Sequence, residues 1–215
     1  MTPYYDHAGI TIYHGDCLEI LPKVSADVLI TDPPYGVDFR GKATKHKAAS
    51  GGYTTQDSDI GLRVVKASLE IVKRGVVFPG NRILHKYPQP RDIGCVYCPS
   101  GAGCGPWGFT CFHPVLFYGK RPGGPTTPSS IQSFDVSDNP GGHPCAKPVR
   151  WLLWSVSLAS CAGEVVFDPF AGSGTTLFAA KQLGRRAIGI EIEEKYCEIA
   201  AKRLSQEVFD FGGKA

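Results

Sequence analysis

The chain has 215 residues, 42% of them hydrophobic, and a formal net charge of +3. We expect one well-buried domain over residues 1–215, since there is too little sequence for two clearly separate ones. The small positive charge permits a polyanionic partner but does not require one. No stretch is long and apolar enough to cross a bilayer, and no secretory signal is recognisable, so the eight cysteines are expected as reduced thiols in a cytoplasm.

Strand and helix patterns alternate along the chain, which predicts an α/β domain with a mostly parallel sheet. The predicted strands cover residues 10–14, 26–31, 76–78, 93–98, 113–119, 164–167 and 186–190. The predicted helices cover residues 17–24, 60–73, 149–161, 175–183 and 194–208. Strands 93–98 and 113–119 are expected to form a hairpin. Residues 37–59 and 120–148 are polar or rich in Gly and Pro, and we expect long loops there.

Ligands of parallel α/β sheets bind at the carboxyl ends of the strands. The residues that follow the predicted strands are therefore the candidates for a site. They are Asp16, residues 32–35, Asn81, residues 168–174 and Glu191.

Residues 30–36 read ITDPPYG and end the predicted strand 26–31. The two prolines exclude a helix and remove two backbone donors, and Pro33 pushes Asp32 toward an extended conformation. The pattern predicts a stiff turn that holds the carboxylate of Asp32 close to the ring of Tyr35.

Residues 167–176 read FDPFAGSGTT, so a strand runs into Asp168, a glycine-rich turn follows, and a helix begins near Thr175. Neither the dinucleotide pattern G-x-G-x-x-G nor the phosphate-loop pattern G-K-[ST] is present. An acid at the strand end favours an amine over a phosphate as the neighbouring group. The next strand ends on Glu191, where an acid accepts hydrogen bonds from ribose hydroxyls in such folds.

TDPPYG together with DPFAGSGTT resembles the amino-group DNA methyltransferases, which use S-adenosylmethionine to methylate adenine N6 or cytosine N4. TDPPYG comes first in this chain, which resembles the permuted beta group of that family. HPCAKP at 143–148 resembles that group's H-x-x-x-K-P element, and residues 10–21 and 75–81 resemble further core segments. The resemblance covers most of residues 10–204.

The resemblance implies a Rossmann-like, circularly permuted fold with helices on both faces of a seven-stranded mixed sheet that has one antiparallel strand. It also implies a cofactor site. Asp168 would hold the amino group of S-adenosylmethionine, with Phe170, Gly172 and Gly174 as the wall. Glu191 would bind the ribose hydroxyls and Asp16 would approach the adenine. Lys147 would lie near the cofactor carboxylate.

In the same resemblance the Asp32–Tyr35 turn is catalytic. The Asp32 carboxylate and the Pro33 carbonyl would accept both N–H groups of a base amine, and Pro33 and Pro34 would pre-set this geometry. The base would be flipped out of the duplex and stacked on Tyr35. Aspartate before Pro-Pro-Tyr is typical of adenine N6 methylation and serine of cytosine N4 methylation. A cytosine-N4 enzyme is therefore one alternative. A second alternative is a non-catalytic module that retains the cofactor fold and binds nucleic acid.

DNA contacts are expected in the loops 37–59 and 120–142. The first carries Arg40, Lys42, Lys45 and Lys47, which suit phosphate binding, although a merely solvated loop has the same composition. The second is short for a base-recognition region, so we expect recognition of a short or relaxed site, or a homodimer. By this resemblance the protein acts in the cytoplasm of a prokaryotic or phage-infected cell.

Cys95, Cys98, Cys104 and Cys111, with His113 nearby, raise the alternative of a zinc site. A strong zinc pattern has two close ligand pairs, and only one C-x-x-C pair is present. Because free cysteine is often a small buried hydrophobe, we expect no metal.

Overall fold

The computed structural model describes residues 1–34, 55–99, 103–105, 108–123, 129–134 and 147–206. Its strands are β1 (Tyr5–His7), β2 (Ile10–His14), β3 (Val28–Thr31), β4 (Arg74–Val77), β5 (Asp92–Tyr97), β6 (Gly103–Gly105), β7 (Gly108–Thr110), β8 (Phe112–Gly119), β9 (Ile131–Ser133), β10 (Val165–Asp168) and β11 (Arg186–Glu191). Its α-helices are α1 (Cys17–Ile20), α2 (Thr55–Ile71), α3 (Val149–Ala159), α4 (Thr175–Gln182) and α5 (Glu194–Ser205). Short 3₁₀ turns are η1 (Leu21–Lys23) and η2 (Leu84–Lys86).

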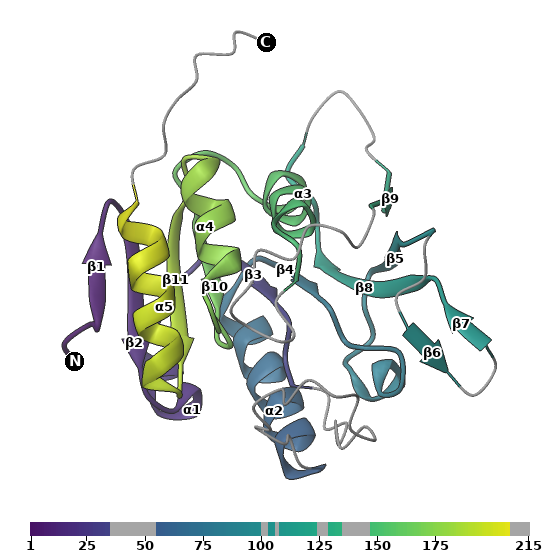
Figure 1. The fold of residues 1–215 in the computed structure, drawn as a ribbon, viewed down its shortest axis with the longest axis horizontal. Coiled ribbons are helices and arrows are strands. Elements are labelled where there is room, and N and C mark those ends of the chain that lie inside the picture. Colours follow the sequence, from purple (N-terminus) through teal and green to yellow (C-terminus); the bar gives the residue numbers. More distant parts are fainter. Residues whose placement is uncertain (35–54, 100–102, 106–107, 124–128, 135–146, 207–215) are drawn as a thin grey trace, which may run out of the picture.

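One large sheet runs through the molecule in the strand order β1-β2-β11-β10-β3-β4-β8-β5-β9 (Figure 1). The strands β2, β11, β10, β3 and β4 are mutually parallel. β8 lies antiparallel to both of its neighbours, β4 and β5, and β1 lies antiparallel to β2. Among the described strands of this sheet, two therefore run against the others, where one antiparallel strand was expected. The predicted α/β fold with a mixed sheet, and the predicted hairpin of β5 and β8, are therefore confirmed.

The predicted number of seven strands is too small, because the described residues alone contribute nine strands to this sheet. The additional strands are β1 and β9, which are three residues long and lie at the two edges. Such short strands carry no recognisable period, and their pairing with β2 and β5 defines them. The circular permutation stays a prediction.

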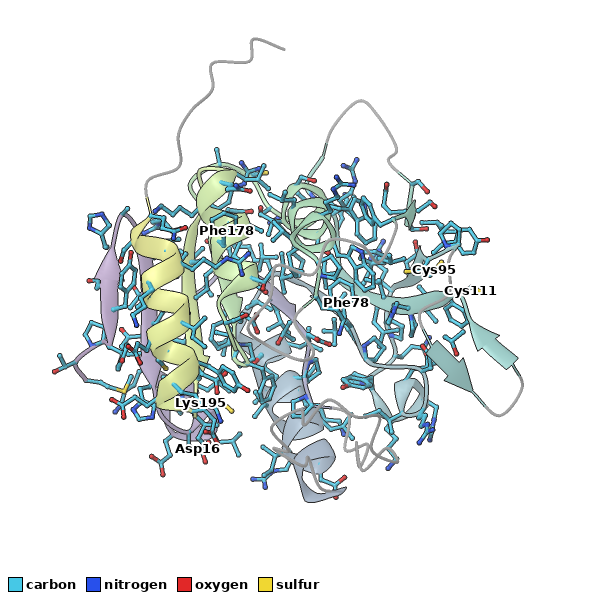
Figure 2. The ribbon with its side chains drawn as sticks, in the orientation of Figure 1. Asp16, Phe78, Cys95, Cys111, Phe178 and Lys195 are labelled. Atoms are coloured by element: carbon cyan, nitrogen blue, oxygen red, sulfur yellow. The ribbon has the colours of Figure 1, made fainter. Side chains whose placement is uncertain are left out.

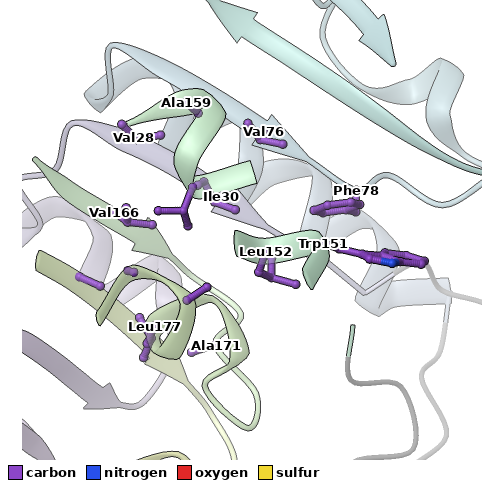
Figure 3. Close-up of a cluster of buried hydrophobic side chains, with 14 of the residues drawn as sticks. Val28, Ile30, Val76, Phe78, Trp151, Leu152, Ala159, Val166, Ala171 and Leu177 are labelled. Carbon is purple, nitrogen blue, oxygen red and sulfur yellow. The ribbon is translucent and has the colours of Figure 1, made fainter. Parts of the chain in front are cut away.

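Helices cover both faces of the sheet. On one face α3, α4 and α5 pack a core that includes Trp151, Leu152, Leu177, Ala200 and Leu204. On the other face α1, η1, α2 and η2 contribute a second core. Figure 3 shows the first core where Val28, Ile30, Val76 and Val166 of the central strands meet α3 and α4. Burial of β3 and β10 on both faces explains why their sequences are almost wholly apolar.

The boundaries of both predicted loops need correction. α2 begins at Thr55, inside the predicted loop 37–59, because its polar first turn shows no apolar period. β9 lies inside the predicted loop 120–142 and pairs with β5, where Ile131 is the partner of Cys95.

Within the described residues, no helix is long and apolar enough to cross a membrane.

Candidate active site

Four acidic residues lie where the parallel strands end, at the lower edge of the sheet in Figure 1. Asp16 and Asp32 follow β2 and β3, Asp168 is the last residue of β10, and Glu191 is the last residue of β11. The register brings the neighbouring strands together, with Asp168 opposite Gly189 and Glu191 opposite His14. The predicted site residues at the strand ends thus share one edge of the sheet.

Two glycines of the turn between β10 and α4 share a left-handed backbone conformation but differ in their surroundings. Gly174 has φ 77°, and a Cβ there would lie 2.8 Å from the Cβ of Ala200, so α5 closes over it. Gly172 has φ 52°, but a Cβ there would meet no atom within 4 Å. The turn is therefore packed tightly on the α5 side and open at Gly172.

The Asp168 carboxylate is buried and oriented by donors on several sides. The Thr31 hydroxyl donates to Asp168 Oδ1 at 2.7 Å, and the Phe170 amide donates to the same oxygen at 3.1 Å. Burial raises the pKa of Asp168 to about 6, while hydrogen bonds from the Thr176 and Thr31 side chains act in the opposite direction. These donors favour the charged form of a carboxylate that burial disfavours.

Glu191 is held by backbone amides of two segments. The Gly172 amide donates to its Oε2 at 2.8 Å, and the Glu193 amide donates to its Oε1 at 2.9 Å. Burial raises the pKa of Glu191, and these amide donors counteract the rise. The carboxylate has further lone pairs, so it can still accept hydrogen bonds from a ligand.

Asp32 lies in an ion pair with Lys147, whose Nζ is 2.5 Å from Asp32 Oδ2. The two side chains are 25% and 13% exposed, so the pair is largely screened from water. Burial raises the pKa of Asp32, and the charge and hydrogen bond of Lys147 oppose this rise. The structure therefore places Lys147 beside the Asp32–Pro34 turn.

The sequence did not predict the aromatic residues around this pair as part of the methyl-transfer site, and it suggested His113 only as a possible zinc ligand. His113 packs against Trp151 with ring centroids 4.7 Å apart, and burial together with the charge of Lys147 lowers the pKa of His113 to about 4. Phe78, whose amide donates to Thr31 O at 3.0 Å, stacks on the same Trp151. A single sequence carries no signal for these contacts, because the residues come from different elements.

Asp16 is exposed and directly precedes α1, and Figure 2 shows it at the lower end of the molecule in that view. Its Oδ1 accepts a hydrogen bond from the Leu18 amide at 2.8 Å, so it serves as the N-cap of α1. Asn81 is also exposed. The predicted approach of Asp16 to an adenine stays a prediction.

Several predicted site residues lie outside the described residues: Tyr35, Arg40, Lys42, Lys45 and Lys47. Their proposed contacts with a base and with DNA phosphates stay predictions. The same holds for most of the loop 120–142.

Cys95 lies on β5 and Cys111 directly precedes β8, on the right-hand side of the molecule in Figure 2. Cys98 is fully buried in the apolar core, and its amide donates to Cys111 O at 2.7 Å. Among the residues whose side chains are described, no three His, Cys, Asp or Glu side chains are grouped as a metal site requires. The Cys104 side chain is outside that set, so metal analysis of the purified protein is the test of the expected absence of zinc.

Comparison with known proteins identifies the class. Residues 85–202, more than half of the chain, match the family model of the N6 and N4 DNA methylases. The chain therefore belongs to the amino-group DNA methyltransferase family, as the two motifs predict. The expected cofactor, S-adenosylmethionine, is consistent with this family and is confirmed by it.

Individual relatives support the same class. The putative methylase YubD of Escherichia coli strain K12 is 31% identical over 206 residues, which cover 89% of this chain and 88% of YubD. The type II methyltransferase M.ScaI of Streptomyces caespitosus is 26% identical to this chain. The alignment covers 95% of this chain and 84% of the length of M.ScaI. M2.DpnII of Streptococcus pneumoniae is 53% identical over 68 residues, which are 31% of this chain and 25% of M2.DpnII.

Solved structures share the fold. The PvuII DNA methyltransferase, described as cytosine-N4-specific, superposes on this chain with a TM-score of 0.72 at 18% sequence identity. The superposition covers 97% of this chain and 90% of the PvuII enzyme. The crystal structure of M1.HpyAVI in complex with S-adenosylmethionine superposes on this chain with a TM-score of 0.66 at 22% sequence identity. The superposition covers 92% of this chain and 100% of M1.HpyAVI.

Proposed function

We propose that the protein transfers the methyl group of S-adenosylmethionine to the N6 amine of an adenine flipped out of duplex DNA. The observation that carries this proposal is the position of Asp32, which directly follows β3 and lies near Asp168 at the end of the neighbouring strand β10. The Thr31 hydroxyl, next to Asp32 in the chain, bonds directly to Asp168. An acceptor for a base amine and an acceptor for a cofactor amine thus lie on neighbouring strands.

The residues fit the cofactor. The open side of Gly172 leaves space against the backbone, the buried Asp168 carboxylate suits an ammonium group, and Glu191 suits ribose hydroxyls. Phe170 and Gly174 complete the wall of this site, and Asp16 approaches the adenine ring. The bound cofactor supplies an electrophilic methyl group on its sulfonium.

Asp32 accepts an N–H of the base amine and so localises the nitrogen lone pair for attack on the methyl carbon. The new bond joins this carbon to the base nitrogen, and the pair of the broken carbon–sulfur bond stays on sulfur. The base nitrogen then releases one proton. A carboxylate whose pKa is raised by burial, as that of Asp32 is, accepts this proton more readily. The Pro33 carbonyl holds the second N–H, Pro34 stiffens the turn, and Tyr35 stacks on the base.

Lys147 keeps Asp32 ionised while the site is empty of base. The same ammonium group would also lie near the carboxylate of S-adenosylmethionine. One cation would then interact with two carboxylates, which would weaken its pairing with Asp32.

Adenine is favoured because aspartate stands before Pro-Pro-Tyr. Cytosine N4 is the second candidate, since its amine has the same chemistry and a structural neighbour is titled cytosine-N4-specific. A non-catalytic module is disfavoured, because the acids of both motifs are retained at one sheet edge.

DNA is held by the loop that carries Arg40, Lys42, Lys45 and Lys47, together with residues 120–142. The shortness of the second loop favours a short target site or a homodimer in which a second copy contributes contacts. The setting is the cytoplasm of a prokaryotic or phage-infected cell.

The test is incubation with duplex DNA and S-adenosylmethionine labelled on its methyl group, followed by digestion to nucleosides. Label in N6-methyl-2′-deoxyadenosine is the expected result. Label in N4-methyl-2′-deoxycytidine would replace the proposed base and keep the mechanism. Unlabelled DNA with bound cofactor would favour the non-catalytic module.

A further inference from the structure

Thr31 contacts both halves of the proposed site. Its side chain is fully buried, and its hydroxyl donates to Asp168 Oδ1 at 2.7 Å across the pair of strands β3 and β10. Its carbonyl accepts from the Phe78 amide at 3.0 Å, which holds it to β4. Asp32 follows it directly in the chain.

A buried carboxylate without donors gains a proton and loses its value as an acceptor for an ammonium group. Asp168 is 3% exposed and lies near Asp32, whose negative charge also favours protonation. The donors that oppose this are the Thr31 and Thr176 side chains and the Phe170 amide. Of the two side chains, Thr31 is the one that belongs to the strand carrying the catalytic turn.

We propose that Thr31 is a positioning residue for the cofactor: its hydroxyl orients Asp168 and keeps it ionised, so that Asp168 binds the cofactor ammonium group. This rests on the proposed role of Asp168. Because Thr31 also fixes the start of the Asp32 turn, it sets the place of the cofactor amine relative to the base-binding carboxylate.

Other titrating groups surround Asp168 and must be separated from it. Asp32 follows β3 and is paired with Lys147, which precedes α3. Glu191 ends β11 and has a raised pKa of its own, so it also affects cofactor binding in acid. A Thr31 variant retains these side chains and the backbone hydrogen bond from Phe78 to Thr31, so a changed pH profile reports the loss of the hydroxyl that donates to Asp168.

The experiment measures binding of S-adenosylmethionine by calorimetry between pH 5 and 8 for Thr31→Val and Thr31→Ser. Thr31→Val keeps the shape and removes the donor, and we expect affinity at pH 7 to fall about tenfold. The fall of affinity in acid should begin at higher pH than in the wild type, because Asp168 protonates more easily. Thr31→Ser restores the hydroxyl and should bind within about threefold of the wild type.

5′-Methylthioadenosine, which lacks the amino-acid part of the cofactor, is the second probe. Its affinity should be the same in wild type and Thr31→Val, because it has no ammonium group for Asp168 to bind. The matched control is Thr11→Val, which removes a Thr–Asp hydrogen bond of 3.0 Å, from Thr11 Oγ1 to Asp6 Oδ1 on β1. It should bind S-adenosylmethionine as the wild type does.

Equal affinity and an equal pH profile in wild type and Thr31→Val would overturn the proposal, as would equal loss in Thr31→Val and Thr31→Ser. Equal loss of both ligands in Thr31→Val would show general damage to the site and would also overturn it. Asp168→Asn separates the two levels of inference. If this variant binds S-adenosylmethionine normally, the role of Asp168 fails, and if it loses binding while Thr31→Val does not, the role of Thr31 alone fails.

Discussion

Lys147 Nζ lies 2.5 Å from Asp32 Oδ2, although the two residues are 115 positions apart in the chain. A second Lys–Asp pair lies at the other end of the same strand, where Lys73 Nζ is 2.6 Å from Asp27 Oδ1. The Lys73 side chain is 68% exposed, whereas that of Lys147 is 13% exposed. The two ion pairs have similar N–O distances but differ in their exposure to water. The Lys73–Asp27 pair can therefore serve as a control for the electrostatic effect of Lys147 on Asp32.

Lys147→Gln should move the acid limb of the methyl-transfer pH profile to higher pH, because the opposite charge that lowers the pKa of Asp32 is lost. Lys147→Arg retains a charge and should move it less. The rate is measured as kcat/KM from pH 5 to 9. Lys73→Gln is the matched control and should leave the profile in place. An acid limb that stays in place in Lys147→Gln would contradict the proposed coupling.

Asp32→Asn should lower kcat at least about 100-fold, since the amide cannot take up the proton released by the base. Binding of S-adenosylmethionine should be retained, because the proposed partner of Asp32 is the base and not the cofactor. Asp27→Asn removes the same charge at the start of β3 and should change stability without a comparable loss of kcat. Full activity in folded Asp32→Asn would exclude the proposed role.

Gly61→Ala should reduce activity without reducing stability. A Cβ at Gly61 of α2 would lie 3.1 Å from the Pro34 carbonyl oxygen and 3.5 Å from Pro33 Cβ, so it presses on the catalytic turn. In a helix, alanine is more favourable than glycine by about 1 kcal/mol, which offsets the crowding. Urea unfolding and single-turnover methyl transfer measure the two effects. Lys66→Ala, on the exposed side of α2, is the control, and unchanged turnover in Gly61→Ala would show that the turn adjusts freely.

The two glycines of the turn should respond differently to alanine. Gly174→Ala meets the Ala200 Cβ at 2.8 Å and is expected to cost about 2–4 kcal/mol of unfolding free energy. Gly172→Ala adds only backbone strain, about 1 kcal/mol, but its methyl group enters the open space proposed for the cofactor. Urea unfolding and cofactor titration should therefore rank the two variants in opposite order. A Gly172→Ala protein with normal cofactor affinity would place the cofactor elsewhere.

The sequence by itself determined most of the elements and the class of protein. Because β3 and β10 are buried on both faces, their sequences are almost continuous apolar runs. The prolines after β3 and the glycines after β10 predict the turns beside Asp32 and Asp168. Such local signals depend only on neighbours in the chain. They also sufficed to predict the hairpin of β5 and β8.

Only the tertiary structure decided the contacts between elements. β1 and β9 exist because longer strands offer them an edge, and neither carries a period of its own. The bond from Thr31 to Asp168 spans 137 positions, and Lys147 reaches Asp32 from the residue two before α3. Hydrogen bonds and ion pairs of this kind depend on distances set by the packing of the sheet, which no local pattern in a single sequence encodes.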